Sequence, residues 1–344
     1  MASLNGKIPA TLIPGDGIGP EITQATISVL EALQAPFQWD EQIAGMAALE
    51  KSGSPLPEET LKSLRRTGLS LKGPLTTQSG KGFRSINVTL RQEFDLFANV
   101  RPARTLVPRP DLARYDHLDI VLIRENIEGY YAAREYYLPQ DNDPEGMALA
   151  AGYVTKKECR RIVRYAFEYA LKNGRKKVTL VHKANIVKLM CGMFLEIGRE
   201  VAKEYSGRVA CDERIVDACA MQLCLDPLQF DVIVTTNLFG DILSDQISGL
   251  IGGLGLAPGA NIGEKMAMFE AVHGSAPDLV GKSCANPVAL MLAGGLMLEH
   301  VGEVEKAHAL RKAIDKTLAS NIRTGDLGGT AKTFEFSQAI IQNL

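Results

Sequence analysis

The chain has 344 residues, 46% of them hydrophobic, which is enough to bury a large core and excludes disorder as its overall state. Lysine and arginine total 38 against 40 aspartates and glutamates, so no global field draws the protein to nucleic acid or to a membrane. A charged ligand must therefore be held by local clusters, within two domains or one large bilobed unit.

Short apolar runs typical of β-strands alternate with helical patterns along the whole chain. The runs predict strands over residues 7–14, 119–123, 177–182 and 231–236. Apolar residues at helical spacing after Pro20 predict a helix over residues 21–32. This alternation is typical of an α/β fold with a largely parallel sheet.

The segment over residues 130–153 breaks that rhythm. It combines aromatic and acidic residues with Pro139 and Pro144, both of which disfavour regular core structure. We therefore expect an insertion at this place and not a core element.

A glycine-rich turn, Gly15-Asp16-Gly17-Ile18-Gly19-Pro20, lies between the first strand and the first helix and suggests a dinucleotide-binding loop. The GxGxxG pattern of such a loop needs its third glycine one residue after Gly19, where this chain has Pro20. We interpret the segment as a tight turn that feeds a helix, and not as a Rossmann phosphate loop.

Cations and small polar donors gather in the first third of the chain. The cluster comprises Lys72, Thr76, Thr77, Arg84, Ser85, Asn87, Arg91, Arg101 and Arg124. Arginine forks bind carboxylates through two parallel hydrogen bonds, so converging arginines suit a substrate with several carboxylates. Ser85 and Asn87 share a face if their segment is extended and diverge if it is helical. The alternative is that the arginines are solvated charges paired with Glu93, Asp95 and Glu125.

Two aspartates follow the predicted strand over residues 231–236 at a spacing that suits a metal ion. Asp241 and Asp245 lie on one face if the segment is a helix, and two like charges so placed favour a cation between them. Hard oxygen ligands favour Mg²⁺ or Mn²⁺, with Asp217 as a possible third ligand. The alternative is that the aspartates only stabilise the start of a helix through its dipole.

Tyr131 and Lys183 are candidates for acid–base catalysis because each follows a predicted strand, where sites of α/β enzymes assemble. A lysine near a metal ion can act as a base, and a tyrosine hydroxyl can deliver a proton. The alternatives are a surface lysine and an interfacial tyrosine. His182 and His273 have no partner spacing typical of a triad or a zinc site, so we expect structural or cofactor-contact roles for them.

The six cysteines form no CxxC pair, which predicts reduced thiols in a cytosol-like compartment. Residues 1–10 lack the features of a signal or transit peptide, and no later run approaches a membrane span. We expect a cytoplasmic protein, or a mitochondrial matrix protein if the source is eukaryotic, with no nucleic-acid or membrane partner.

Together these segments resemble the β-decarboxylating dehydrogenases, the family of isocitrate and 3-isopropylmalate dehydrogenases. Residues 12–21 match the first strand and turn of that family, and residues 237–245 match its metal signature. The similarity covers nearly the whole chain. It implies an α/β isocitrate/isopropylmalate dehydrogenase-like fold with two domains and a clasp insertion, which is not a Rossmann fold.

The resemblance also implies a domain plan and an assembly. The large domain would comprise residues 1–96 and 252–344, and the small domain residues 97–251. A clasp at about residues 130–153 would interlock two subunits, so that a homodimer shares its active sites. Such dimers could associate further.

Site residues carry over one by one from the family. Arg91, Arg101 and Arg124 match binders of the substrate carboxylates, and Asp241 and Asp245 match metal ligands of the same subunit. Lys183 and Asp217 match residues that the other subunit supplies, and Tyr131 matches the proton donor. Ser85 and Asn87 match the pair that distinguishes isocitrate enzymes, whose substrate has a carboxylate where isopropylmalate has an apolar branch.

The cofactor prediction rests on residues 273–279, which resemble the adenosine loop of the family. The implied cofactor contacts are Thr77, Asn185, His273, Gly274, Ser275, Ala276, Asp278, Leu279 and Asn286. NADP-using members carry a Lys-Tyr pair at the positions of Asp278 and Leu279, and an acidic side chain there would repel a 2′-phosphate. Gly325 and Gly329 stand where such members add Tyr and Arg, so NAD is the expected cofactor.

These residues imply NAD-dependent oxidative decarboxylation of isocitrate to 2-oxoglutarate and CO₂, with Mg²⁺ or Mn²⁺. Two alternatives remain open. One is a sister enzyme that acts on homoisocitrate, 3-isopropylmalate or tartrate, and the other is a non-catalytic regulatory subunit of a heteromeric isocitrate dehydrogenase.

Overall fold

The fold is known from a computed structural model that describes residues 6–77, 85–106 and 112–344. Arg84 and residues 1–5, which entered the expectations above, lie outside the described residues. The chain divides into two compact units. Unit 1 comprises residues 1–96, 101–118 and 248–344, and unit 2 comprises residues 97–100 and 119–247. No helix among the described residues is long and apolar enough to cross a membrane.

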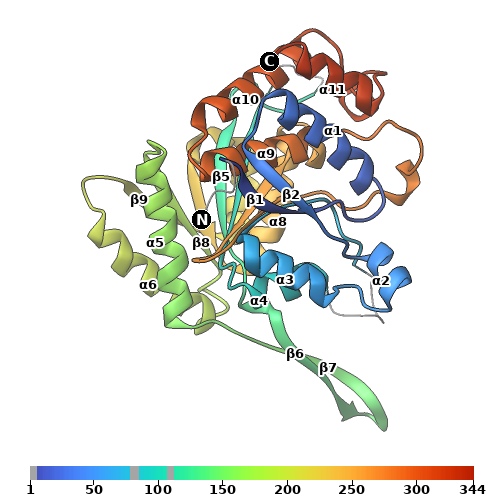
Figure 1. Cartoon of the computed structure of the whole chain (residues 1–344). Coiled ribbons are helices and arrows are strands. Elements are labelled where there is room, and N and C mark those ends of the chain that lie inside the picture. Colours follow the sequence, from blue (N-terminus) through green and yellow to red (C-terminus); the bar gives the residue numbers. More distant parts are fainter. Residues whose placement is uncertain (1–5, 78–84, 107–111) are drawn as a thin grey trace. The chain divides into compact units, whose positions relative to one another are not determined.

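The sheet portion of unit 1 has the strand order β2-β1-β3-β12-β11, in which only β11 and β12 pair antiparallel (Figure 1). The strands are β1 (Ile8–Ile13), β2 (Phe37–Glu41), β3 (Leu69–Lys72), β11 (Pro258–Ile262) and β12 (Ala267–Ala271). The helices are α1 (Gly19–Ala32), α2 (Met46–Ser52), α3 (Glu58–Thr67), α4 (Ile86–Glu93), α9 (Val288–His300), α10 (Val304–Ala319) and α11 (Thr333–Ile341).

Helix α9 forms the centre of unit 1. Its sequence is apolar on every side, and it contacts β11, β12, α1 and α10. A helix that is apolar all round is stable only when it is covered all round. Helix α1 begins at Gly19, two residues before the predicted start, with Pro20 in the first turn, where its missing N–H is harmless.

The sheet portion of unit 2 has the order β5-β10-β8-β9, with every pair parallel. The strands are β5 (Asp119–Glu125), β8 (Lys177–His182), β9 (Ala210–Ile215) and β10 (Val232–Thr235), and β4 (Ala98–Arg104) runs from unit 2 into unit 1. The helices are α5 (Lys156–Lys172), α6 (Met190–Glu204), α7 (Val216–Leu225) and α8 (Asn237–Leu250). The predicted strands are confirmed, and the parallel order brings the carboxyl ends of β5, β8 and β10 to one edge.

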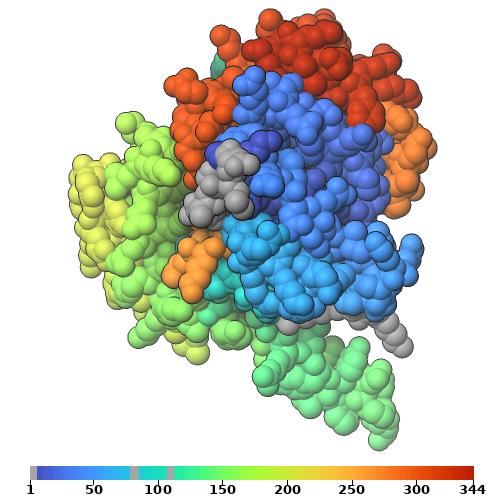
Figure 2. Space-filling view, in the orientation of Figure 1, coloured from blue at the N-terminus to red at the C-terminus, as the bar shows by residue number. Residues whose placement is uncertain are grey.

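The segment predicted to be an insertion is a two-stranded ribbon, β6 (Gly129–Gln140) paired antiparallel with β7 (Asp143–Tyr153). It stands away from the helices of unit 2 in Figure 1, and Figure 2 shows it protruding. Asp141 and Asn142 join the strands with φ of +51° and +64°, as in a tight hairpin turn. An isolated two-stranded ribbon is only marginally stable in water.

Candidate active site

Arg124, at the carboxyl end of β5, is 1% exposed and makes three kinds of contact within unit 2. Its Nε and Nη2 donate to Oδ1 of Asn237 at 3.0 and 2.7 Å, and its Nη1 donates to Oδ1 of Asp241. Its Cζ lies 4.8 Å from the centre of the Tyr131 ring, within reach of a cation–π contact. A Cβ on Gly240 would lie 2.6 Å from Cγ of Arg124, so the glycine leaves the space that Arg124 fills. The guanidinium is therefore held in one orientation.

The hydroxyl of Tyr131, on β6, donates to Oδ2 of Asp241. Burial raises the pKa of Tyr131, and its bond to Asp241 raises the pKa further, although the nearby cation of Arg124 opposes both. The phenol therefore stays protonated at neutral pH, as a proton donor must. The carboxylate of Asp241 thus accepts hydrogen bonds from both Tyr131 and Arg124.

Asp241 and Asp245 lie one turn apart on α8, so both carboxylates are on one side of this helix. Neither is in its first turn, which argues against a simple dipole role. The Asp241 side chain is 34% exposed and Asp245 is exposed, so these hard oxygen donors fit Mg²⁺ or Mn²⁺. In the described part of the chain, no three Asp, Glu, His or Cys side chains come together to hold an ion. Asp217 therefore does not join this pair among the described residues of the chain.

Lys183 follows β8 directly, and its Nζ donates to Oδ1 of Asp217. Asp217 is in the first turn of α7, which follows β9, the parallel neighbour of β8. The hydrogen bond from Lys183 lowers the pKa of Asp217. The Asp217 side chain is 68% exposed, so this pair is open to a second molecule.

His182 is buried at the end of β8, and its Nδ1 accepts a hydrogen bond from the amide of Ala184 at 3.1 Å. Burial lowers its pKa, so the ring is neutral at pH 7 and holds the turn that follows. Asn185, a predicted cofactor contact, is exposed in that turn.

Lys72 and Arg91 in unit 1 share a buried partner that the sequence did not reveal, Glu270 on β12. Nζ of Lys72 lies 2.7 Å from one oxygen of Glu270, and Nη2 of Arg91 lies 3.6 Å from the other, which also accepts from Asn261 at 2.8 Å. Burial opposes ionisation of Glu270, but the two cations prevail and hold its pKa at about 2. The only hint in the sequence was one acid within the apolar run of β12.

The interpretation of the arginines as solvated surface charges is wrong for Arg91, Arg101 and Arg124, whereas Arg84 lies outside the described residues. Lys72, Arg91, Arg101 and Arg124 are buried, at 1%, 8%, 9% and 1% exposure respectively. Glu93, one of the partners expected for them, forms an ion pair with Arg65 instead, with Nη2 of Arg65 2.6 Å from Oε1 of Glu93. Buried cations need partners, which favours a ligand-binding or strictly structural role for all four.

Ser85 and Asn87 do not lie on an extended segment, because α4 begins between them at Ile86, with Ser85 as its N-cap residue. Oγ of Ser85 lies 3.3 Å from Oγ1 of Thr77, a predicted cofactor contact. Oδ1 of Asn87 is buried and has no hydrogen-bond partner among the described residues. An unsatisfied buried amide is costly, so this group favours a polar ligand beside it.

Residues 273–279 form a turn of backbone that ends in a 3₁₀ segment, Pro277–Leu279. Nδ1 of His273 lies 2.9 Å from the carbonyl oxygen of Gly274, its Nε2 is buried without a partner among the described residues, and burial lowers its pKa. Ala276 has φ of +40°, which is strained for a residue with a side chain. Asn286 donates to Asp326 at 2.9 Å, which the sequence did not predict.

Three positions are expected from the resemblance to decide whether a 2′-phosphate fits. Gly325 is open, Asp278 is acidic and Gly329 is blocked. Asp278 is exposed at the tip of the 3₁₀ segment, and a Cβ on Gly325 would meet nothing within 4 Å. A Cβ on Gly329 would lie 2.0 Å from the carbonyl oxygen of Arg323, so no side chain fits there unless the backbone moves. The backbone at Gly329 therefore leaves no space for a cationic side chain that could bind a 2′-phosphate.

Glu125, beside Arg124 in the sequence, is buried and accepts backbone N–H bonds from Ile127 at 2.8 Å and Glu128 at 3.1 Å. Burial raises its pKa from 4.5 to about 7, although these N–H donors oppose the shift. The folded chain thus binds a proton that the unfolded chain releases between these two pH values.

The contribution of Glu125 to the stability of the protein is therefore expected to fall as the pH rises through 7. The carboxyl of Glu125 makes its full contribution to the free energy of unfolding below about pH 4.5. By pH 8 roughly 3 kcal/mol of that free energy is lost. Glu125→Gln should flatten this dependence, because the amide stays neutral and can still accept the N–H bonds. Urea unfolding of both proteins at pH 5 and pH 8 measures the effect, and an equal pH slope in the two proteins would contradict it.

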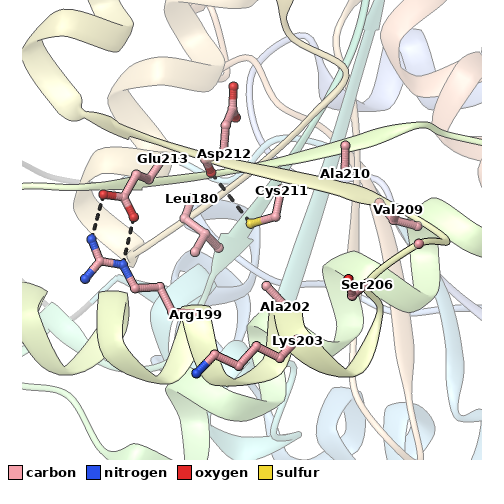
Figure 3. Close-up of a pocket in the computed structure, with 11 residues that line it drawn as sticks. Leu180, Arg199, Ala202, Lys203, Ser206, Val209, Ala210, Cys211, Asp212 and Glu213 are labelled. Carbon is pink, nitrogen blue, oxygen red and sulfur yellow. Dashed lines mark hydrogen bonds and ion pairs between the residues drawn. The ribbon is translucent and has the colours of Figure 1, made fainter.

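A surface hollow of about 730 Å³ between β9 and α6 holds none of the predicted site residues (Figure 3). Two of its charged groups pair with each other, since Arg199 donates to both oxygens of Glu213 at 2.9 and 2.7 Å. Burial raises the pKa of the Cys211 thiol to about 11, so it is not a reactive thiolate. We find no catalytic constellation in this hollow.

Known proteins resemble this chain over nearly its whole length. The isocitrate/isopropylmalate dehydrogenase family matches residues 9–340. The chain is 45% identical to "Isocitrate dehydrogenase [NAD] catalytic subunit 5, mitochondrial" of Arabidopsis thaliana, over 100% of this chain and 90% of that protein. It is 46% identical to a 3-isopropylmalate dehydrogenase of Archaeoglobus fulgidus, over 96% and 97% of the two chains. The crystal structure of isocitrate dehydrogenase from Methylococcus capsulatus superposes with a TM-score of 0.94 at 51% identity, over 97% and 98%.

The fold and the family match thus define the class of protein, the decarboxylating dehydrogenases, whose members use a divalent metal ion and NAD(P). The chain belongs to the isocitrate/isopropylmalate dehydrogenase family. Its relatives are named for two different substrates, so membership alone leaves the substrate open.

Proposed function

We propose that this protein catalyses the NAD-dependent oxidative decarboxylation of isocitrate to 2-oxoglutarate and CO₂. The observation that carries the proposal is the cluster of Arg124, Tyr131 and Asp241. In this cluster the buried guanidinium of Arg124 and the protonated phenol of Tyr131 both donate to the carboxylate of Asp241. The cation would bind a substrate carboxylate, and Asp241 is a ligand of the kind that Mg²⁺ and Mn²⁺ prefer.

The choice of isocitrate is supported by the start of α4. Isocitrate has a third carboxylate where isopropylmalate has an apolar branch, and a polar pocket discriminates strongly between the two. Ser85 supplies a hydroxyl there, and Asn87 supplies an amide whose buried end has no partner among the described residues. A flip of this amide would present its NH₂ group to a carboxylate.

The choice of NAD over NADP is supported by the surroundings of the adenosine loop. Asp278 is an exposed acid that can accept hydrogen bonds from a ribose diol and repels a phosphate. Gly329 has no space for the cation that a 2′-phosphate demands. Both features act against NADP and leave NAD unhindered.

In the mechanism that we propose, Lys183, relayed through Asp217, removes the proton of the substrate hydroxyl. Arg91, Arg101 and Arg124 bind the carboxylates and orient the substrate. Asp241 and Asp245 would hold the metal ion, and the bound groups supply Lewis acidity from Mg²⁺ or Mn²⁺ and hydride acceptance by NAD. Tyr131 then protonates the enolate that remains when CO₂ departs.

A homodimer with shared sites follows from the same proposal, in which Lys183 and Asp217 reach the site of a second copy. Tyr136, Tyr137 and Leu138 of the β6–β7 ribbon are 50%, 58% and 42% exposed, which is unusual for large apolar residues in a monomer. Leu189 at the start of α6 and Leu225 at the end of α7 are 86% and 71% exposed. Pairing with a second copy would cover these groups.

The first experiment measures NADH formation by the purified chain with isocitrate and Mg²⁺ or Mn²⁺, beside assays with NADP and with 3-isopropylmalate. We expect turnover with isocitrate and NAD to exceed every other combination by at least about tenfold. Turnover with isopropylmalate alone would favour the sister enzyme, in accordance with the name of the Archaeoglobus relative. No turnover in any assay would favour a regulatory subunit, which the complete set Tyr131, Lys183, Asp217, Asp241 and Asp245 disfavours.

A further inference from the structure

The glycine-rich turn between β1 and α1 resembles a phosphate loop, but three of its amides already donate to carbonyl oxygens within unit 1. The amide of Asp16 donates to the carbonyl oxygen of Pro74 at 2.7 Å, and that of Ile18 donates to the carbonyl oxygen of Ser275 at 2.9 Å. The amide of Gly19 donates back to Asp16 at 2.9 Å. A loop that cradles phosphate needs such N–H groups free, so this turn serves another purpose.

Gly17 lies against the loop that carries the predicted adenosine contacts. Its φ is +61°, and a Cβ there would lie 2.0 Å from the carbonyl oxygen of Ser275 and 2.9 Å from the Cβ of Ser275. Backbone atoms of a packed loop cannot yield by that amount without moving the loop. Glycine at this position therefore permits the Ile18–Ser275 hydrogen bond and fixes the distance between the two segments.

Asp16 ties a second segment to the same turn. Its carboxylate is buried, with Oδ1 accepting from the amide of Met46 and Oδ2 accepting from the amide of Thr76, both at 2.8 Å. Oγ1 of Thr76 in turn donates to Oγ of Ser275 at 2.9 Å. The turn, the segment at Thr76–Thr77 and the loop at Ser275 thus form a closed set of hydrogen bonds.

We propose that Asp16 and Gly17 are positioning residues for the dinucleotide. They hold two segments with predicted cofactor contacts, Thr77 on one and residues 273–279 on the other, at a fixed separation. The inference rests on the proposed function, in which these two segments bind NAD. It assigns a role to Asp16 and Gly17 that differs from phosphate binding, because both act through the segments that they contact.

The test compares Gly17→Ala with Gly53→Ala, a matched control. Gly53 also has a positive φ, +74°, but a Cβ there meets nothing within 4 Å. Both variants therefore place alanine in the same unfavourable backbone region, and only Gly17→Ala adds a clash with Ser275. Asp16→Asn is a second variant of native size that replaces one acceptor oxygen by a donor.

Two measurements are made on each full-length variant. Amide hydrogen exchange in the free protein reports order in residues 74–77 and 272–280, and NADH fluorescence reports affinity. We expect Gly17→Ala and Asp16→Asn to exchange faster in both segments and to bind NADH about tenfold more weakly. We also expect the KM for NAD to rise at nearly unchanged kcat, with Gly53→Ala like the wild type throughout.

The outcomes separate this inference from the proposed function. If the Gly17 and Asp16 variants match Gly53→Ala in both amide exchange and NADH affinity, the positioning role alone is overturned. A wild-type chain that binds no NADH would overturn the proposed function, and the positioning role with it. A selective loss of NADH affinity with faster exchange supports both.

Discussion

Replacing Tyr131 with phenylalanine is expected to reduce kcat by about 10²–10⁴ while the KM for isocitrate changes little. The substitution removes only the hydroxyl that donates to Asp241 and leaves the ring beneath Arg124 in place. Substrate binding through the arginine should therefore survive, whereas the enolate would lose its proton donor. Steady-state NADH formation at saturating isocitrate and NAD measures the effect.

Tyr130→Phe is the matched control for this prediction. Tyr130 is the preceding residue on β6 and is 47% exposed, and we assign it no role in the chemistry. It should keep wild-type turnover, and both variants should melt within a few degrees of the wild type. Full activity of Tyr131→Phe would remove the tyrosine from the mechanism and leave the source of the proton open.

The parallel strands β1, β5, β8 and β10 were predictable because they are largely buried, whereas the more exposed β2 and β9 were not predicted. Residues 177–182 contain the β-type residues Val178, Thr179 and Val181, and β8 has the same bounds. Prediction was less successful at the ends of elements, as for α1, which begins at Gly19. Helix starts depend on which backbone amides find partners, and those partners come from distant segments.

The β6–β7 ribbon shows a different limit of the sequence. Pro139 and Pro144 suggested irregular structure, and both lie within strands close to the hairpin turn, where the register shifts between the pairs Leu138–Met147 and Gln140–Asp143. Each strand of a two-stranded ribbon has one unpaired edge, where a proline removes no hydrogen bond. The sequence therefore predicted that the segment stands outside the core but not how it is built.

The candidate site was predictable as a set of residue types but not as a set of pairs. Arg124 and Asp241 were singled out from spacing and resemblance, while the bond between them spans 117 positions. Asn237 accepts from Arg124 and donates to the carbonyl oxygen of Glu128, and nothing local in the sequence indicates this bridge. Glu270 likewise pairs with Lys72 only because β3 and β12 are neighbours. Such pairs arise from strand order, which local patterns do not encode.

Lys183→Met is expected to abolish turnover, and mixing it with Tyr131→Phe is expected to restore about a quarter of the wild-type activity. In the proposed dimer, each site takes Tyr131 from one chain and Lys183 from the other. Random reassociation of equal amounts makes about half of the dimers hybrid, and each hybrid has one intact site and one doubly defective site. Activity is measured after the two inactive variants are dissociated together and refolded.

The control mixes Tyr131→Phe with Asp241→Asn, whose residues lie in one cluster within unit 2 of one chain. Every site of these hybrids carries one defect, so no activity should return. If the mixture with Lys183→Met also stays inactive, although hybrids form, Lys183 and Tyr131 serve the same site from a single chain. That result would be hard to reconcile with the separate surroundings of the two residues, because Lys183 bonds the outward-facing Asp217 while Tyr131 bonds Asp241. Recovery in the first mixture alone would therefore establish that the exposed Lys183–Asp217 pair works in the site of a partner.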